Sequence, residues 1–131
     1  MRVIIAGSRS FDDYVALKDY CDEVIGTYRS RERVPHQDIE IVSGGCTGTD
    51  KLGERYARAN GWKCKVFPAN WDEYGKAAGP IRNGQMAEYA CKSPDGFGVL
   101  IAFPKPNSKG TKNMIMQASN AGIDIYMKEI D

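Results

Sequence analysis

The chain has 131 residues, a formal net charge of +1, 42% hydrophobic residues and 27% charged residues. This length and composition are typical of one globular domain, here residues 1–131, with a buried core. The near-zero charge argues against a nucleic acid or a membrane surface as partner, and no apolar run approaches the roughly 20 residues that a membrane span needs. The first residues have the character of a strand and not of a signal peptide, so we expect a cytoplasmic protein.

The four cysteines and the single histidine are spread along the chain. They form neither a C-x-x-C pair nor a spacing typical of zinc ligands. We therefore expect reduced thiols, no metal and no cofactor.

Short apolar runs rich in β-branched residues alternate with segments of helical periodicity. The predicted strands are residues 2–6, 39–43, 62–67, 98–103 and 123–127. The predicted helices are residues 15–28, capped by Asp12 or Asp13, and residues 51–60, 81–92 and 111–120. Residues 70–79 are predicted to form a polar loop, with Pro80 in the first turn of the next helix. This alternation predicts a Rossmann-like three-layer α/β sandwich with a mainly parallel five-stranded sheet and helices on both faces.

A glycine-rich turn, Ser43-Gly44-Gly45-Cys46-Thr47-Gly48-Thr49-Asp50, joins the second predicted strand to a helix. Such a turn can bind phosphate, because the first N–H groups of a helix have no intrahelical partner and glycines let an anion approach the backbone. The turn matches neither the Walker A loop nor G-x-G-x-x-G, so a tight turn with nothing bound remains an alternative. Thr47 and Asp50 have the spacing of a capping box. Asp50 is therefore either a helix cap or a group that contacts ribose or transfers a proton.

The loops after the first, second and fourth strands are expected to open on one edge of the sheet, where ligands of parallel α/β sheets bind. Arg9 and Arg82 are the candidate cations, since an arginine can bind phosphate through two N–H groups; the alternative is an exposed surface arginine. Trp71 and Tyr74 either stack on a base or anchor their loop. Cys46 has no histidine placed to act as its base, so we do not expect a nucleophilic cysteine.

Four blocks of sequence, taken together, resemble the SLOG superfamily, and within it the small single-domain YpsA-related branch. The blocks are GSRSF at 7–11, SGGCTGTD at 43–50, AGPIRNGQM at 78–86 and GT at 110–111. The resemblance implies a Rossmann-like fold that binds a nucleotide or a nucleotide-derived ligand. Whether the chain pairs with itself, as members of the superfamily often do, is left open.

The LOG phosphoribohydrolases of the same superfamily have phosphate-binding glycines before a catalytic glutamate, assisted by an upstream arginine and a methionine. Arg82 and Met86 match the upstream element, and Gly110 and Thr111 match part of the glycine block. Met114 stands at the position of the glutamate. Because a methionine can neither transfer a proton nor stabilise a developing cation, hydrolysis by the LOG mechanism is not expected.

Two hypotheses follow. The first is a nucleotide-binding module that senses or processes its ligand, and the second is an enzyme that cleaves an N-glycosidic or phosphate bond in a nucleoside monophosphate or an ADP-ribose-like ligand. The expected binding residues are Gly7, Ser8, Arg9, Gly44, Gly45, Thr47, Gly48, Asn83, Gly110 and Thr111. In the second hypothesis Asp50 would be the acid or base and Arg82 the phosphate clamp. DNA binding in the manner of DprA is the weakest alternative, because the chain lacks a basic stripe.

Overall fold

The central feature of the computed structural model, which describes residues 1–131, is a sheet of five parallel strands in the order β3-β2-β1-β4-β5. The strands are β1 (Arg2–Gly7), β2 (Glu40–Ser43), β3 (Lys63–Val66), β4 (Gly98–Phe103) and β5 (Asp124–Met127). All four strand pairs are parallel, with Val3 of β1 in register with Ile41 on one side and Val99 on the other. The predicted α/β fold and its five strands are confirmed.

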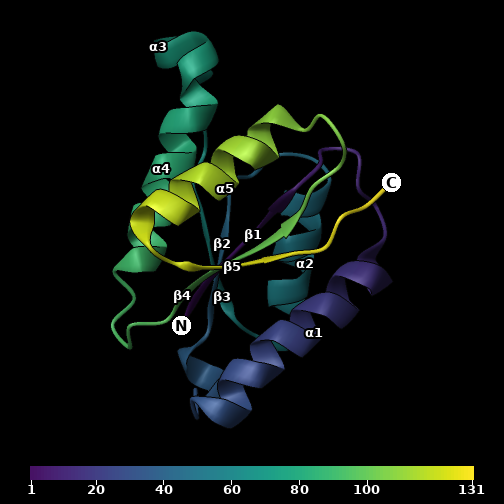
Figure 1. Cartoon of the computed structure of the whole chain (residues 1–131), viewed down its shortest axis with the longest axis vertical. Coiled ribbons are helices and arrows are strands. Elements are labelled where there is room, and N and C mark those ends of the chain that lie inside the picture. The colour runs from purple at the N-terminus through teal and green to yellow at the C-terminus, as the bar shows by residue number, and fades with distance from the viewer.

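The helices cover both faces of the sheet (Figure 1). One face is covered by α1 (Tyr14–Arg31) and α2 (Thr49–Asn60), and the other by α4 (Ala78–Cys91) and α5 (Lys109–Ala121). Side chains of β1 alternate between the two faces, so Val3 and Ile5 belong to one buried cluster and Ile4 and Ala6 to the other. Burial on both faces explains why the central strands are almost continuously apolar. None of the helices combines the length and the apolar character that crossing a bilayer would need.

The helix ends are confirmed at two places where the sequence contained a cap. The side chain of Asp13 accepts a hydrogen bond from the Ala16 N–H at 3.0 Å and begins α1. Gly61 ends α2 in the left-handed conformation, at a φ of 70°. After α1, which continues to Arg31, a 3₁₀ turn, η1, spans His36–Asp38 before β2.

The capping box predicted for α2 is wrong. Gly48 is the N-cap residue and makes no side-chain cap bond. The Thr47 hydroxyl donates to the Arg9 carbonyl oxygen at 3.4 Å, and the Asp50 carboxylate accepts the Cys46 N–H at 3.0 Å. Both side chains are therefore used in contacts outside the helix, which the spacing of the motif could not reveal.

The polar loop predicted at residues 70–79 is also wrong. A short helix, α3 (Trp71–Tyr74), and a 3₁₀ turn, η2 (Gly75–Ala77), lead directly into α4, which begins at Ala78. The Asn70 side chain caps α3 by accepting the Glu73 N–H at 3.1 Å. In Figure 1, α3 extends beyond the sheet at the end of α4.

The order of the strands creates a crevice beside β1. The chain leaves β1 toward α1 on one face, whereas it leaves β4, the neighbour of β1, toward α5 on the other face. The loops after β1 and β4 therefore diverge, and the space between them is where open parallel sheets bind ligands.

Candidate functional site

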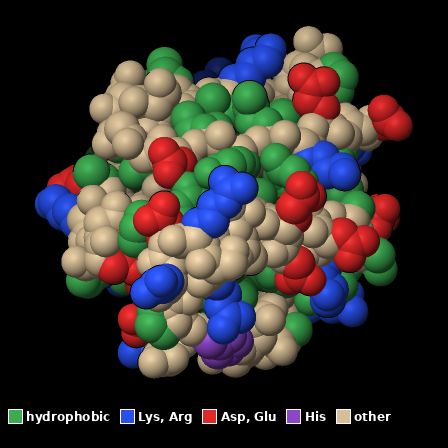
Figure 2. Space-filling model, turned by 60° about the horizontal axis from the view of Figure 1, so that its bottom comes forward, with side chains coloured by type: hydrophobic (Ala, Val, Ile, Leu, Met, Phe, Trp, Pro, Cys, Tyr) green, Lys and Arg blue, Asp and Glu red, His purple; other side chains and the backbone are tan.

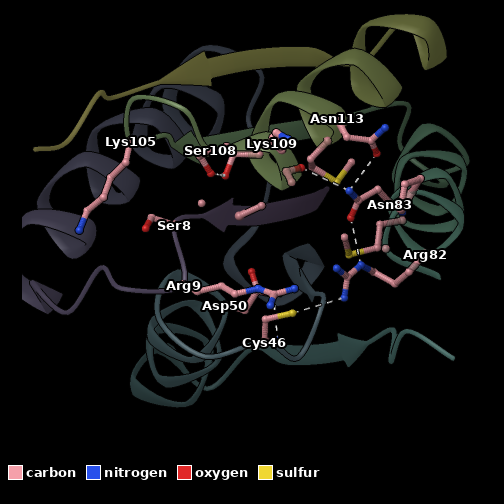
Figure 3. Close-up of a pocket in the computed structure, with 18 of the residues that line it drawn as sticks. Ser8, Arg9, Cys46, Asp50, Arg82, Asn83, Lys105, Ser108, Lys109 and Asn113 are labelled. Carbon is pink, nitrogen blue, oxygen red and sulfur yellow. Dashed lines mark hydrogen bonds between the residues drawn. The ribbon is translucent and has the colours of Figure 1, made fainter. Parts of the chain in front are cut away.

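A cavity of about 580 Å³ opens at the carboxyl ends of β1 and β4 (Figure 3). Its walls come from five parts of the chain: the end of β1 with the following loop, the turn after β2 with the start of α2, the α3–η2 segment, the first turns of α4, and the loop after β4 with the start of α5. Of the expected binding residues, Gly7, Ser8, Arg9, Asn83, Gly110 and Thr111 line this cavity, and Asp50 and Arg82 line it as well. The structure thus brings together residues from segments that are distant in the sequence.

The N-terminus of α5 faces the cavity. Ser108 is its N-cap residue, and the first bond within the helix runs from the Lys112 N–H to the Ser108 carbonyl oxygen at 3.0 Å. The N–H groups of residues 109–111 consequently have no partner within the helix. The hydroxyl groups of Ser108 and Thr111 lie 2.7 Å apart beside them. Free N–H groups, hydroxyls and the positive end of the helix dipole form a site suited to an anion.

The loops after β1 and β4 are connected at one end of the cavity. Lys105 donates a hydrogen bond of 2.7 Å to the Ser10 hydroxyl, and the Ser10 N–H donates to the Ser8 hydroxyl at 3.2 Å. Figure 3 shows Lys105 and Ser8 at this end, away from Arg82 and Asn83. These bonds hold the ammonium group of Lys105 against the loop after β1, at one end of the cavity.

Arg82 and Asn83 are buried at the opposite end. Arg82 is 7% exposed; its Nε donates to Asn83 Oδ1 at 3.0 Å and its Nη1 to the Gly44 carbonyl oxygen at 2.6 Å. Asn83 in turn donates to the side chain of Asn113 at 3.0 Å. The remaining nitrogen of Arg82, Nη2, makes no hydrogen bond within the protein. The side chain is therefore fixed in position while one pair of donors is left for a ligand.

Asp50 is the acidic residue of the site. It is 7% exposed, and burial raises the pKa of its carboxyl group to about 6. The Cys46 N–H and the positive charge of Arg82 act in the opposite direction, because both favour the charged form, and they offset only part of the effect of burial on this pKa. A carboxyl group with such a pKa at a cavity can donate or accept a proton near neutral pH.

The glycine-rich turn after β2 contributes less to the cavity than its sequence suggests. Only Cys46 and Asp50 of this turn line the cavity; Gly44, Gly45, Thr47 and Gly48 do not. A Cβ atom on Gly44 would lie 2.7 Å from Arg82 Nη1, and one on Gly48 would overlap the carbonyl groups of Ser8 and Arg9. The absence of a side chain at these two glycines leaves space for other groups of the protein. The composition of the turn alone cannot distinguish this role from phosphate binding.

Several cavity residues were not anticipated from the sequence. They are Lys76, Lys105, Ser108, Lys109 and Asn113. The signal that could have identified Ser108 and Lys109 is a serine directly before a helical segment, which marks an N-cap. Trp71 also lines the cavity, whereas Tyr74 does not. The sequence alone offers no reason to assign different roles to these two aromatic residues.

The cavity is more basic than the molecule as a whole. Its basic residues are Arg9, Lys76, Arg82, Lys105 and Lys109, and Asp50 is the one acidic residue. By contrast, the net charge of the chain is +1, and the surface in Figure 2 has acidic and basic side chains interspersed. No three histidine, cysteine or acidic side chains lie close enough together to hold a metal ion.

The strand order and this site define a class: an α/β protein of Rossmann-like topology with a basic cavity at the switch in strand order. Within that class, the chain belongs to the YspA, cpYpsA-related SLOG family, whose model matches residues 1–74. The match confirms the SLOG membership and the YpsA-related branch expected from the four blocks, and it supports a role related to nucleotides.

Two further proteins are similar to this chain. The chain is 32% identical over 130 residues to the Gene 61 protein of Mycobacterium phage D29, an alignment that covers 95% of this chain and 93% of the phage protein. The fold is similar to that of DNA processing protein A (DprA) from Streptococcus pneumoniae, with a TM-score of 0.63 and 19% identity. That similarity covers 96% of this chain but 49% of DprA, so the chain spans about half the length of DprA.

Proposed function

We propose that the protein binds a nucleotide or a nucleotide-derived ligand in the basic cavity, with a phosphate group at the N-terminus of α5. The observation that carries the proposal is the free N-terminus of a 13-residue helix that faces a cavity lined by five basic residues and one acidic residue. An anion there would accept hydrogen bonds from backbone N–H groups and be neutralised by Lys105 and Lys109. The volume of about 580 Å³ lies within the range of small-molecule sites, about 300–1,000 Å³.

The opposite end of the cavity has the polar groups that a ribose needs. Arg82 Nη2 and the amide of Asn113 supply donors, and Asp50 can accept a hydrogen bond from a hydroxyl group. Because Arg82 and Asn83 are held by hydrogen bonds before any ligand arrives, they lose little conformational entropy on binding. A phosphate site and a sugar site in one cavity favour a nucleotide over a simple inorganic anion.

Calorimetric titration with AMP, ADP-ribose and NAD tests the proposal. We expect at least one of these ligands to bind, with an affinity that falls as the salt concentration rises, since phosphate recognition here depends on charge. A folded protein that binds none of them would contradict the proposal.

A second candidate function is cleavage of an N-glycosidic bond in the same ligand, and Asp50 is the observation that favours it. Its carboxyl group lines the cavity and has a pKa of about 6, as a general acid or base requires. Met114 also lines the cavity but cannot take this role, because its thioether has no proton to donate and is too weak a base to accept one.

Incubation with AMP and detection of free adenine separates the two candidates. Turnover should fall about 10²–10⁴-fold in an Asp50→Asn variant that still binds AMP, if Asp50 acts as acid or base. If the wild-type protein binds AMP but releases no adenine, the cleavage function is wrong and the binding function stands.

A further inference from the structure

Trp71 is the only aromatic side chain that lines the cavity. It is 48% exposed, so about half of its surface is in contact with solvent. Tyr74 lies on the same short helix and is 45% exposed, but it is not part of the cavity wall. The two aromatic residues therefore differ in their access to the cavity and hardly at all in exposure.

The short helix that carries Trp71 is capped by a side chain, and the indole lies close to the start of α4. The Asn70 side chain accepts the Glu73 N–H at 3.1 Å and donates to the Glu73 carboxylate at 2.9 Å, which secures the turn that carries Trp71. The edge of the ring lies near Gly79 in the first turn of α4, where a Cβ atom would be 3.4 Å from Trp71 Cη2. The ring is therefore close to the start of α4 and forms part of the cavity wall.

The other groups around the cavity suit the phosphate and the sugar of a nucleotide but not its base. They are mostly charged or polar side chains and backbone N–H groups, with Met86 and Met114 among the few apolar contributors. Trp71 alone presents an aromatic face of the size of a nucleobase. Stacking on such a face is tolerant of the base and contributes substantially to affinity.

We propose that Trp71 is the stacking surface for the nucleobase, so that the ligand is a nucleoside phosphate with its base attached and not a sugar phosphate. This inference rests on the proposed function, because it assumes that a phosphate occupies the same cavity. Trp71 would contact the base, which a nucleotide has and ribose 5-phosphate lacks, and would therefore discriminate between the two ligands.

The first test compares AMP with ribose 5-phosphate, which has the same phosphate and sugar but no base. Wild-type protein should bind AMP about 10-fold or more tightly than ribose 5-phosphate, and Trp71→Ala should lower the affinity for AMP about 10-fold while leaving that for ribose 5-phosphate unchanged. Tyr74→Ala is the matched control, since it removes an equally exposed aromatic ring from the same helix outside the cavity, and it should bind both ligands as the wild type does.

Tryptophan fluorescence gives a second readout that does not depend on a truncated side chain. The chain has two tryptophans, and Trp62 packs against His36 and Tyr56 away from the cavity. AMP should quench the fluorescence of the wild-type protein and ribose 5-phosphate should not. In Trp71→Phe, which keeps a smaller aromatic face, the quenching should be lost while AMP still binds more tightly than it does to Trp71→Ala.

The outcomes separate this inference from the function on which it rests. AMP binding that is unchanged in a folded Trp71→Ala variant, or that leaves wild-type fluorescence unaltered, would overturn the role of Trp71 and keep the proposed function. If neither AMP nor ribose 5-phosphate binds, and ADP-ribose and NAD also fail to bind, both proposals are wrong. Should Trp71→Ala fail to fold, the wild-type quenching and the Trp71→Phe titration decide.

Discussion

Arg82 donates a hydrogen bond of 2.6 Å from Nη1 to the carbonyl oxygen of Gly44, and so connects the first turns of α4 to the loop after β2. The two residues are 38 positions apart in the sequence. The guanidinium occupies the space in which a side chain at position 44 would stand. The position of the buried cation at the cavity therefore depends on the absence of a single Cβ atom.

Gly44→Ala should displace the guanidinium of Arg82. The added methyl group would lie 2.7 Å from Arg82 Nη1 and 2.9 Å from Asp50 Oδ2, and neither group can move far because both are buried. We expect a loss of about 1–3 kcal/mol in the free energy of unfolding, together with weaker binding of AMP. Urea denaturation and calorimetry measure the two effects. Gly26→Ala in α1, where nothing lies within 4 Å, is the control and should be neutral or stabilising; equal losses in both variants would argue against the steric mechanism.

Gly48→Ala should be far more destabilising than Gly61→Ala, although both residues have a positive φ, 77° and 70°. At position 61 the space beside the backbone is empty, so only the left-handed conformation costs energy, about 1–2 kcal/mol. At position 48 the methyl group would also overlap the carbonyl groups of Ser8 and Arg9, and we expect a total loss above about 3 kcal/mol. Thermal unfolding of the two variants provides the comparison, and similar melting temperatures would contradict it.

Asp50→Asn should change how stability depends on pH. The pKa of the Asp50 carboxyl group is about 6 in the folded protein and 3.8 as its ordinary value, so between these two pH values the folded state binds more protons than the unfolded state. The contribution of this group to the free energy of unfolding is therefore largest below about pH 4 and falls by about 3 kcal/mol as the pH rises through about 6. Asparagine keeps an oxygen that can accept the Cys46 N–H but does not ionise.

Relative to the wild type, the Asp50→Asn variant should consequently gain about 2–3 kcal/mol between pH 4 and pH 7. Urea denaturation at several pH values measures the difference, and the comparison cancels the contributions of the other carboxyl groups. Parallel profiles for the two proteins would show that burial does not raise the pKa of Asp50.

Lys109→Glu should weaken the binding of AMP about 10-fold or more, because a carboxylate would replace a cation at the first residue of α5 and repel the phosphate. Lys112→Glu is the matched control: it makes the same charge change one turn further along, outside the cavity wall. Neither change should impair folding, since acidic residues near a helix N-terminus are favourable. Calorimetric titration at low salt compares the variants, and equal affinities would argue against phosphate binding at α5.

Much of the fold could be predicted from local patterns. The apolar run at residues 98–103 predicts a strand, and the structure has β4 at Gly98–Phe103, because a strand buried on both faces has a continuous apolar sequence. Alternation of strands and helices predicts a parallel sheet, since parallel neighbours need a crossover helix. The helical segment at α3 escaped prediction, because it is a single turn held by Asn70 and Glu73 and leaves no periodic pattern.

The sequence by itself determined the edge of the sheet at which the cavity lies and several of its residues, such as Ser8, Arg82 and Thr111, because parallel strands direct their following loops to one edge. Only the tertiary structure decided that the glycines at positions 44 and 48 make room for Arg82 and for the carbonyl groups of Ser8 and Arg9. It also decided that the N-terminal part of α5 forms more of the cavity wall than the glycine-rich turn before α2 does. A glycine in the sequence can indicate that another group lies close to the backbone at that position, but it does not identify that group. That group comes from elsewhere in the chain, and its identity depends on how the helices pack across the sheet.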